Sequence, residues 1–450
     1  MAAAAQGLSV RLLDEAPQAG GQVYRAPPQS FGAKADPEGI RLRERLRASP
    51  VTTCFDHTVW SVSPGFRVDA LRPDGTVSFT ARAVIVAAGA QERVVPFPGW
   101  TLPGVIGLAG ATIMLKSQGL LPGRLTLVAG QGPLLLAVAV GILKAGGRLA
   151  AVIDLASRAE WWADGPAIAS RPALAARGTA WQLKLRRAGV PIFYRHAIRT
   201  VTQTESGLAV ATGPVDAEGA PLAGAGHEFL VDVVTVGNGL TASTDVTRLL
   251  RAEHEFKAVR GGWVPTLDAD FRTSLPGLYV AGDGAGIAGA AAAARDGWLA
   301  GLAAARDLGA LSTAAYEQRV APLRRAASRA RLFGAAMAKL MALRPAQVAA
   351  IAGETIVCRC EDVTRGELDA AVREGAREVN QVKAWTRCGM GPCQGRICGD
   401  IVGALVAGRG NGRHEAGYFT GRTPFRPLPL SQLAPLTDYA DLRLPPPAPL

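Results

Sequence analysis

Five of the six cysteines lie close together near the C-terminus. Four of them form two close pairs, Cys358-x-Cys360 and, after residues 361–387, Cys388-x4-Cys393. Four thiolates in two close pairs suit a zinc ion or an iron–sulfur cluster, since both are bound by deprotonated cysteine sulfur. A secreted protein stapled by disulfides would space its cysteines more evenly. The pattern therefore indicates an intracellular metal site, with thiols that bind no metal as the alternative.

The residues around these cysteines predict a helical module with tight turns. Residues 388–395 read Cys-Gly-Met-Gly-Pro-Cys-Gln-Gly, and glycines there let the backbone bend sharply and direct N–H groups at anionic sulfur. Between the two pairs a helix is expected over residues 363–375, with Thr364 at its N-cap and Glu367 completing a capping box. The fifth cysteine, Cys398, starts a second expected helix, and we expect it to pack in the core rather than to bind metal.

The two cysteine segments resemble a known kind of iron–sulfur domain. Cys-Arg-Cys-Glu-Asp-Val-Thr, followed by Thr-Arg-Cys-Gly-Met-Gly-Pro-Cys-Gln-Gly-Arg, is similar to the bacterioferritin-associated-ferredoxin type of [2Fe–2S] domain. It is particularly similar to the version fused to subunits of opine oxidase, hydrogen cyanide synthase and dye-linked proline or hydroxyproline dehydrogenases. The resemblance implies a [2Fe–2S] cluster with the ligands Cys358, Cys360, Cys388 and Cys393. The alternatives are a zinc knuckle and a disulfide-reductase pair of Cys388 and Cys393, which would be expected nearer the N-terminal unit.

Three glycine-bearing segments follow short apolar strands and could contact a dinucleotide. The first, residues 20–25, reads Gly-Gly-Gln-Val-Tyr-Arg and comes after an apolar strand and the acidic pair Asp14-Glu15. The acid at the end of the second strand of a dinucleotide-binding unit binds ribose hydroxyls, and Asp14 has the expected spacing, with Glu15 as the alternative. The second and third segments are residues 84–93 and 277–289.

The order and spacing of these segments resemble the pyridine-nucleotide–disulfide-reductase superfamily over about 300 residues. The resemblance implies a bound FAD. It places Asp283 at the ribityl–pyrophosphate region and points the N-terminus of the following helix at the isoalloxazine ring, where partial positive charge stabilises reduced, anionic flavin. The expected FAD-contacting residues are Asp14, Glu15, Gly20, Gly21, Gln22, Arg25, Ala88, Gly89, Gly282 and Asp283.

The front of the chain departs from this pattern. The first strand of the unit and its G-x-G-x-x-G turn are missing, and residues 1–10 read as the helix that follows that turn. Without the turn, the FAD pyrophosphate loses its cradle of backbone N–H groups. We therefore expect that the natural chain starts upstream and that Met1 is an internal methionine. The alternative is a truncated subunit that binds FAD weakly or not at all.

A second glycine turn predicts another nucleotide site. Gly130-x-Gly132 follows the strand 125–129 and opens a helix, which is the context that a dinucleotide turn requires. Leu135 stands where a third glycine is usual, and Asp154 ends the next strand at a spacing close to that of a ribose-binding acid. The site is expected to take NAD(P) or an adenine nucleotide, with a structural role as the alternative.

These motifs need a framework of alternating strands and helices, which indicates parallel, doubly wound sheets. The expected fold class is α/β: a two-dinucleotide-binding-domain flavoprotein of pyridine nucleotide-disulfide reductase type, N-terminally truncated, with a small α-rich [2Fe–2S] domain. Single strands are expected over residues 229–236 and 277–281. The expected domains are residues 1–100 and 236–305 for FAD, 101–235 for the second nucleotide, 306–353 as a helical connector, 354–408 for the cluster and 409–450 as an extended, proline-rich tail.

The composition argues against other classes of protein. With 48% hydrophobic residues the chain is globular rather than disordered. The formal charge of +12 comes mostly from arginine spread along the chain, so nucleic-acid binding is not expected. No transmembrane span is expected, because glycines and a proline interrupt the longest apolar run, residues 125–143. We expect a cytoplasmic protein, with peripheral attachment to an anionic membrane surface as the alternative.

Together the two cofactor patterns predict electron transfer. We expect a flavin and iron–sulfur subunit of a heteromeric dehydrogenase or oxidase acting on C–N bonds of amino acids, imino acids or opines. A second flavoprotein subunit would oxidise the substrate, a small ferredoxin-like protein would be a further partner, and a quinone would be the acceptor. The alternatives are a self-contained NAD(P)H-dependent ferredoxin-type reductase and a non-enzymatic assembly or sensor protein. No histidine stands out as a substrate base.

Overall fold

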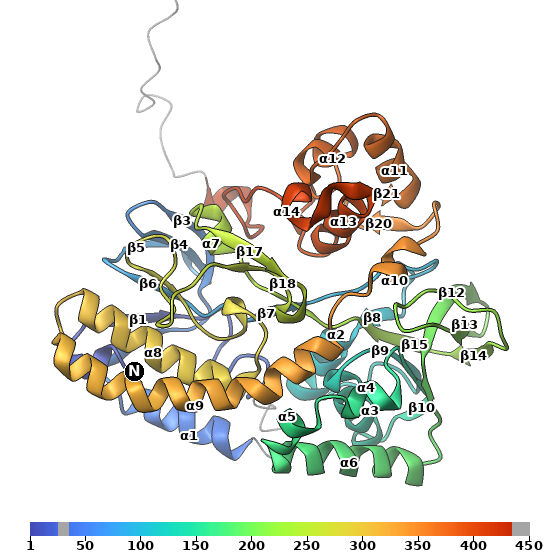
Figure 1. Cartoon of the computed structure of the whole chain (residues 1–450), viewed down its shortest axis with the longest axis horizontal. Helices are drawn as coiled ribbons and strands as arrows, with labels where there is room; N and C mark the ends of the chain where they lie inside the picture. The colour runs from blue at the N-terminus through green and yellow to red at the C-terminus, as the bar shows by residue number, and fades with distance from the viewer. Residues whose placement is uncertain (26–35, 434–450) are drawn as a thin grey trace, which may run out of the picture.

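The computed structural model describes residues 1–25 and 36–433. Figure 1 shows two α/β units side by side, two long helices along one edge and a helical module resting on top. Among the described residues, no helix is long and apolar enough to cross a membrane.

The second unit is built on a five-stranded parallel sheet in the order β11-β10-β9-β15-β8. Its central strands are continuous apolar runs because both faces of the sheet are covered. Helices α2, α3 and α6 pack on one face, and an antiparallel β12-β13-β14 sheet packs on the other. The bounds are β8 Val105–Gly107, α2 Leu108–Ile113, β9 Leu125–Gly130, α3 Pro133–Lys144, β10 Arg148–Asp154, α4 Arg158–Trp162, α5 Gly165–Ala169, α6 Pro172–Arg187, β11 Ile192–Tyr194, β12 His196–Thr204, β13 Gly207–Pro214, β14 His227–Val231 and β15 Val233–Gly237.

One expected strand of this unit is in fact two. Residues 229–236 were expected to form a single strand, but β14 pairs with β13 and β15 pairs with β9 and β8 in a different sheet. The break falls at Asp232, whose backbone N–H donates to the carbonyl of Leu125 and whose carboxylate accepts from the N–H of Leu125. The polar side chain thus marks the corner where the chain passes from one layer to the next.

The parallel strands of the first unit form two separate pairs. β1 (Val10–Leu13) pairs with β2 (Val51–Cys54), and β6 (Val84–Val86) pairs with β19 (Leu278–Val280). Among the described residues no strand joins β1 to β6, and Ile85 in β6 is 38% exposed. The other elements of the unit are α1 Pro37–Arg47, β3 Thr58–Ser63, β4 Arg67–Arg72, β5 Gly75–Thr80, α7 Asp245–Leu249, β17 His254–Lys257, β18 Gly262–Pro265 and α8 Ala290–Asp307.

The first residues do not form the helix that the sequence predicted. They contain one short 3-10 turn, η1 (Ala4–Gln6), which Gly7 ends in a left-handed conformation. Ala2, Ala3 and Ala4 are buried, and Ala2 lies directly against Gly301 of α8. The segment therefore packs as part of the core of the first unit.

The two units are joined where β7 (Ala90–Glu92) pairs with β16 (Leu240–Ala242). The expected helical connector is present as α9 (Thr313–Leu340), which lies beside α8 in Figure 1, and α10 (Pro345–Ala349). These helices carry the chain along both units to the module above them.

The module has its own core, which includes Val357, Val379, Ile401 and Val402. The capping box predicted at Thr364 and Glu367 is confirmed, and it starts α11. Residues 409–433 are not simply an extended tail, because α14 lies within them; residues 434–450 lie outside the described part of the chain. The bounds are β20 Ile356–Cys358, β21 Val363–Thr364, α11 Arg365–Arg373, α12 Val379–Thr386, α13 Gly399–Val406 and α14 Gly412–Ala416.

Candidate metal centre and nucleotide sites

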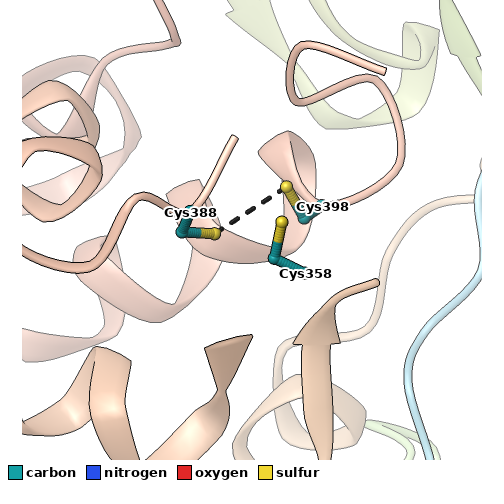
Figure 2. Close-up of side chains that lie close together, drawn as sticks. All are labelled: Cys358, Cys388 and Cys398. Atoms are coloured by element: carbon teal, nitrogen blue, oxygen red, sulfur yellow. Dashed lines mark hydrogen bonds between the residues drawn. The ribbon is translucent and has the colours of Figure 1, made fainter. Parts of the chain in front are cut away.

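Three cysteine side chains converge in the core of the module. Cys358 ends β20, Cys388 follows α12 and Cys398 precedes α13, and Figure 2 shows their sulfurs pointing toward one another. The three Sγ atoms lie within 4.8 Å of one another, and those of Cys388 and Cys398 are 3.8 Å apart. All three residues are buried. Hydrogen bonds from the thiols of Cys388 and Cys398 lower the pKa of Cys358 to about 2, and the same contacts raise the pKa of Cys388 and Cys398, so Cys358 is the thiolate of this group.

The other two predicted ligands, Cys360 and Cys393, form a second pair beside this group. Burial raises the pKa of the Cys360 thiol, and the neighbouring thiols of Cys393 and Cys358 raise it further. A side chain at Gly391 would collide with Cys360, so this glycine permits the close approach. Cys360 is exposed, which places one edge of the candidate site at the surface.

The glycines of the cysteine loop have two roles. The N–H of Gly389 points at Sγ of Cys358 at 3.5 Å, as expected for a loop that directs N–H groups at sulfur. The ring of Phe419 packs on Gly389, Gly395 and Gly399, and a Cβ at Gly389 would lie 2.7 Å from it. The ring therefore seals the inner side of the loop, a role that the glycine spacing did not predict.

The donor set fits an iron–sulfur cluster. Soft thiolates, burial and a backbone N–H directed at sulfur are the features that such a cluster requires. The structure groups two of the predicted ligands, Cys358 and Cys388, with Cys398, where we expected only a packing residue, and it pairs the other two, Cys360 and Cys393, beside that group. A cluster needs four of these five thiols, and the assignment of the four ligands stays a prediction.

The module is fixed to the end of the second flavin segment by buried charges. Asp400 in α13 accepts a hydrogen bond from Nε of Arg93 at 2.7 Å and another from Arg413. Burial acts to raise the pKa of Asp400, but the two guanidinium groups outweigh it and hold the pKa below its usual range. Nε1 of Trp100 also donates to the carbonyl of Ile356 at 2.6 Å. These contacts set the position of the cysteine site relative to the first unit.

The first predicted flavin segment lies at the carboxyl end of β1. Asp14 accepts a hydrogen bond from the N–H of Ala16 at 3.0 Å, and burial raises the pKa of its carboxyl group. A Cβ at Gly20 would lie 2.9 Å from the carbonyl oxygen of Tyr24, so only glycine fits this turn. Arg25 reaches the second unit and donates to Oγ of Ser117. The predicted contacts Glu15, Gly21 and Gln22 lie on the same loop, with Glu15 and Gln22 exposed.

The second and third flavin segments lie against each other. The N–H of Ser243 donates to the carbonyl of Gly89 at 3.0 Å, and Gly284 contacts both residues. Asp283, which follows Gly282 after β19, accepts from the N–H groups of Ala288 and Gly289, both at 2.8 Å. It thereby fixes the loop that leads into α8.

The backbone of these segments is open to a ligand at two glycines. The N-cap residue of α8, Gly289, has no side chain of its own, and a Cβ added at Gly89 or Gly289 would meet nothing within 4 Å. Ala88 is exposed beside them. The positive end of a long helix therefore faces open space next to both segments, where it can stabilise a reduced, anionic ring.

The second glycine turn is covered by the chain itself. A Cβ at Gly132 would lie 2.5 Å from Cγ of Met341, which follows α9. The side chain of Gln131 donates to the carbonyls of Ala342 and Asn238, at 3.1 and 3.2 Å. Leu135, in the place of a third glycine, is fully buried in the core.

Asp154, the acid predicted to bind ribose at this second site, already accepts hydrogen bonds from within the protein. Asp154 is 1% exposed and accepts hydrogen bonds from the N–H of Ala156 and from Nε1 of Trp161, at 2.9 and 2.8 Å. Burial raises the pKa of this carboxyl to about 7. The spacing of Gly130, Gly132 and Asp154 therefore matches a nucleotide site, but in this structure neither the turn nor the acid is free for a ligand.

The titration of Glu92, near the end of the second flavin segment, should make the stability of the fold depend on pH. Both carboxylate oxygens accept from the N–H of Ala109 at the start of α2, and burial raises the pKa of Glu92 from 4.5 to about 7. Between pH 4.5 and 7 the folded protein binds more protons than the unfolded chain, so stability falls as the pH rises. Above this window the loss reaches about 3 kcal/mol at most.

Glu92→Gln should remove this loss while keeping an acceptor for Ala109. In urea unfolding, the variant should gain stability over the wild type as the pH rises from 4.5 to 7, and the gain should then stay level. A difference that is constant across that range would contradict the buried, protonated state of Glu92.

Comparison with known sequences supports the interpretation of both halves of the chain. The family described as "Pyridine nucleotide-disulphide oxidoreductase" matches residues 1–297. This chain belongs to that family. The description "BFD-like [2Fe-2S] binding domain" matches residues 356–407 of this oxidoreductase, the region that contains all five clustered cysteines. FAD and a [2Fe–2S] cluster are therefore its cofactors, and the expected fold class is confirmed.

Relatives similar to this oxidoreductase are subunits of larger enzymes. An opine oxidase subunit of Rhizobium meliloti (strain 1021) is 34% identical over 97% of this chain and 95% of its own length. Hydrogen cyanide synthase subunit HcnB of Pseudomonas aeruginosa is 31% identical over 95% of this chain and 94% of its own length. Among solved structures, L-proline dehydrogenase from P. horikoshii shares the fold, with a TM-score of 0.66 and 20% identity over 96% of this chain and 76% of its own.

Proposed function

We propose that this oxidoreductase is the flavin and iron–sulfur electron-transfer subunit of a heteromeric dehydrogenase or oxidase that acts on C–N bonds of amino acids, imino acids or opines. The observation that carries the proposal is the direct docking of the cysteine module on the flavin unit through Asp400 and Arg93. A flavin can accept an electron pair and release it one electron at a time, and a [2Fe–2S] cluster accepts single electrons, so two such groups in one chain could split a pair.

The relatives support the heteromeric part of the proposal. They are named as subunits of opine oxidase and hydrogen cyanide synthase, and they match almost the whole of this chain. A second flavoprotein subunit would oxidise the C–N bond, and a small ferredoxin-like subunit would complete the complex. Electrons would leave toward a quinone or a similar acceptor. FAD would be held by the predicted contacts on β1, β6 and β19 and the loops that follow them.

The histidines give no sign of a substrate base in this chain. Burial lowers the pKa of His254 to about 4, and its ring bonds Thr247 and the carbonyl of Ala252. His196 and His227 stack with Phe193 in the second unit, away from the flavin segments. Substrate oxidation is therefore assigned to the partner subunit.

The partner can be identified by affinity purification of the tagged chain from its native host, followed by mass spectrometry. We expect a second flavoprotein to co-purify in a fixed ratio. Recovery of the chain alone, with full flavin and cluster content, would contradict a heteromeric enzyme.

The main alternative, a self-contained NAD(P)H reductase, makes a different prediction. Because Met341 and Ala342 cover the glycine turn and Trp161 engages Asp154, anaerobic NADH or NADPH should leave the flavin of the purified chain oxidised. Dithionite should bleach the same sample, which shows that the flavin can be reduced. Rapid bleaching by either nucleotide, recorded by absorbance, would favour the reductase instead.

A further inference from the structure

One ion pair links the flavin frame to the cysteine loop. Nε of Arg396 donates to Oδ2 of Asp245 at 3.0 Å. The Arg396 side chain is 10% exposed and that of Asp245 is 28% exposed, so solvent screens this pair only partly. The two residues are 151 positions apart in the sequence, and each is in contact with one of the two cofactor regions.

On the flavin side, Asp245 is tied to the second flavin segment. It starts α7, three residues after β16, and β16 pairs with β7 of that segment. The side chain of Gln91 in β7 donates to the same Oδ2 atom at 3.4 Å. Ser243, between β16 and α7, donates its N–H to the carbonyl of Gly89. The carboxylate is thus held on the strand pair that lines the predicted flavin site.

On the cluster side, Arg396 lies in the cysteine loop and donates a hydrogen bond to the backbone of that loop. Nη1 donates to the carbonyl of Cys393 at 3.1 Å, and Nη2 donates to the carbonyl of Phe425. Arg396 also lies between Cys393 and Cys398 in the sequence. One guanidinium group therefore bonds a predicted ligand residue, the flavin frame and the C-terminal segment at once.

We propose that Asp245 and Arg396 are positioning residues that hold the cluster loop on the flavin frame and set the reduction potential of the cluster. The inference rests on the proposed function. A cluster bound by the predicted ligands would gain one negative charge on reduction, and Arg396 bonds the backbone of one of those ligands, Cys393. The positive guanidinium stabilises that charge and the carboxylate opposes it, and the partly dry surroundings make both effects larger than in water.

The two members of the pair therefore have opposite effects, which gives a signed test. Arg396→Gln leaves the carboxylate uncompensated, so the cluster becomes harder to reduce. Asp245→Asn leaves the guanidinium uncompensated, so the cluster becomes easier to reduce. Each change should shift the equilibrium constant for electron exchange between flavin and cluster by about tenfold, in opposite directions.

The chain offers a matched control in the ion pair of Arg387 with Glu361. This pair also flanks the cysteine loop, with a distance of 2.9 Å between Nε and Oε2, but the Arg387 side chain is 70% exposed. Water and salt screen such a charge. Arg387→Gln should therefore leave the potential close to that of the wild type.

The experiment is a redox titration of the purified holoprotein, with the reduced cluster followed by electron paramagnetic resonance. The expected result is a lower potential for Arg396→Gln, a higher one for Asp245→Asn and no change for Arg387→Gln. Arg396→Lys keeps the charge and tests the loop contact separately; its potential should stay nearer the wild type than that of Arg396→Gln. Shifts of the same sign in Arg396→Gln and Asp245→Asn, or no shift in either, would overturn the inference.

The outcomes separate the inference from the proposed function. A wild-type protein without any [2Fe–2S] signal contradicts the proposed function, and the inference falls with it. A wild-type signal with unmoved potentials in the variants contradicts the inference alone. If Arg396→Gln does not fold, the shift in Asp245→Asn still tests the inference. A contact that is only structural predicts no rise in the reduction potential of the cluster in that variant.

Discussion

Replacing Cys358 with serine should abolish the signal of the reduced cluster and bring the iron content of the module to background. Cys358 is the central thiol of the site: it is buried, its sulfur accepts from the N–H of Gly389, and it has the lowered pKa of a thiolate. A serine hydroxyl stays protonated near neutral pH and is a hard donor, so it replaces a thiolate poorly on iron. Because the module has a core of its own, the flavin unit should keep its fold and its yellow colour.

Three further variants sharpen this prediction. Cys54→Ser, in β2 and away from the cysteine site, is the matched control and should keep the full signal. The predicted ligand set requires that Cys388→Ser loses the signal and that Cys398→Ser keeps it. The reverse result would reassign the fourth ligand to Cys398. A full signal in Cys358→Ser would contradict the site itself. Iron and sulfide analysis, together with electron paramagnetic resonance, measures the cluster content of all four variants.

The second large effect is expected for Asp400→Asn, which should weaken the docking of the module by about 3–5 kcal/mol. The change leaves Arg93, with a side chain 2% exposed, and Arg413 buried without a counter-charge. A buried charge without its partner costs far more than an exposed ion pair gains. Guanidinium unfolding of the wild type and the variant, followed by cluster absorbance, measures the difference.

The control is the exposed pair of Lys339 and Asp164, with a distance of 3.4 Å between nitrogen and oxygen. Asp164→Asn should change stability by no more than about 1 kcal/mol. If Asp400→Asn costs no more stability than this control, the buried pair does not hold the module.

The depressed pKa of Asp400 adds a pH effect on the stability of the docked module. The stabilisation by Asp400 is present above the unfolded pKa of 3.8 and is lost as the pH falls through the lower folded pKa.

Local patterns in the sequence predicted most of the framework. The capping box at Thr364 and the glycine turns after apolar strands depend on neighbouring residues, and the structure has both where they were expected. The split of residues 229–236 into two strands was missed because a continuous apolar run hides a polar corner at Asp232.

Contacts between distant residues were not predictable from spacing. Gln131 bonds a carbonyl 211 positions away, and Arg93 bonds a carboxylate 307 positions away. The sequence pattern of a nucleotide turn is intact around Gly130, but the residues that cover it come from the end of α9. Cys398 was set aside for the same reason, since its position before a helix did not show that the helix aims its sulfur at Cys358.

The most direct test is whether the cluster becomes reduced after anaerobic addition of a C–N substrate or of NADH. The complex purified with its partner would be mixed with amino acids, imino acids and opines, and the isolated chain with NADH, and electron paramagnetic resonance spectra would be recorded. We predict that a C–N substrate produces the reduced [2Fe–2S] signal in the complex and that NADH produces none in the isolated chain. A reduced cluster in the isolated chain with NADH alone would contradict the account.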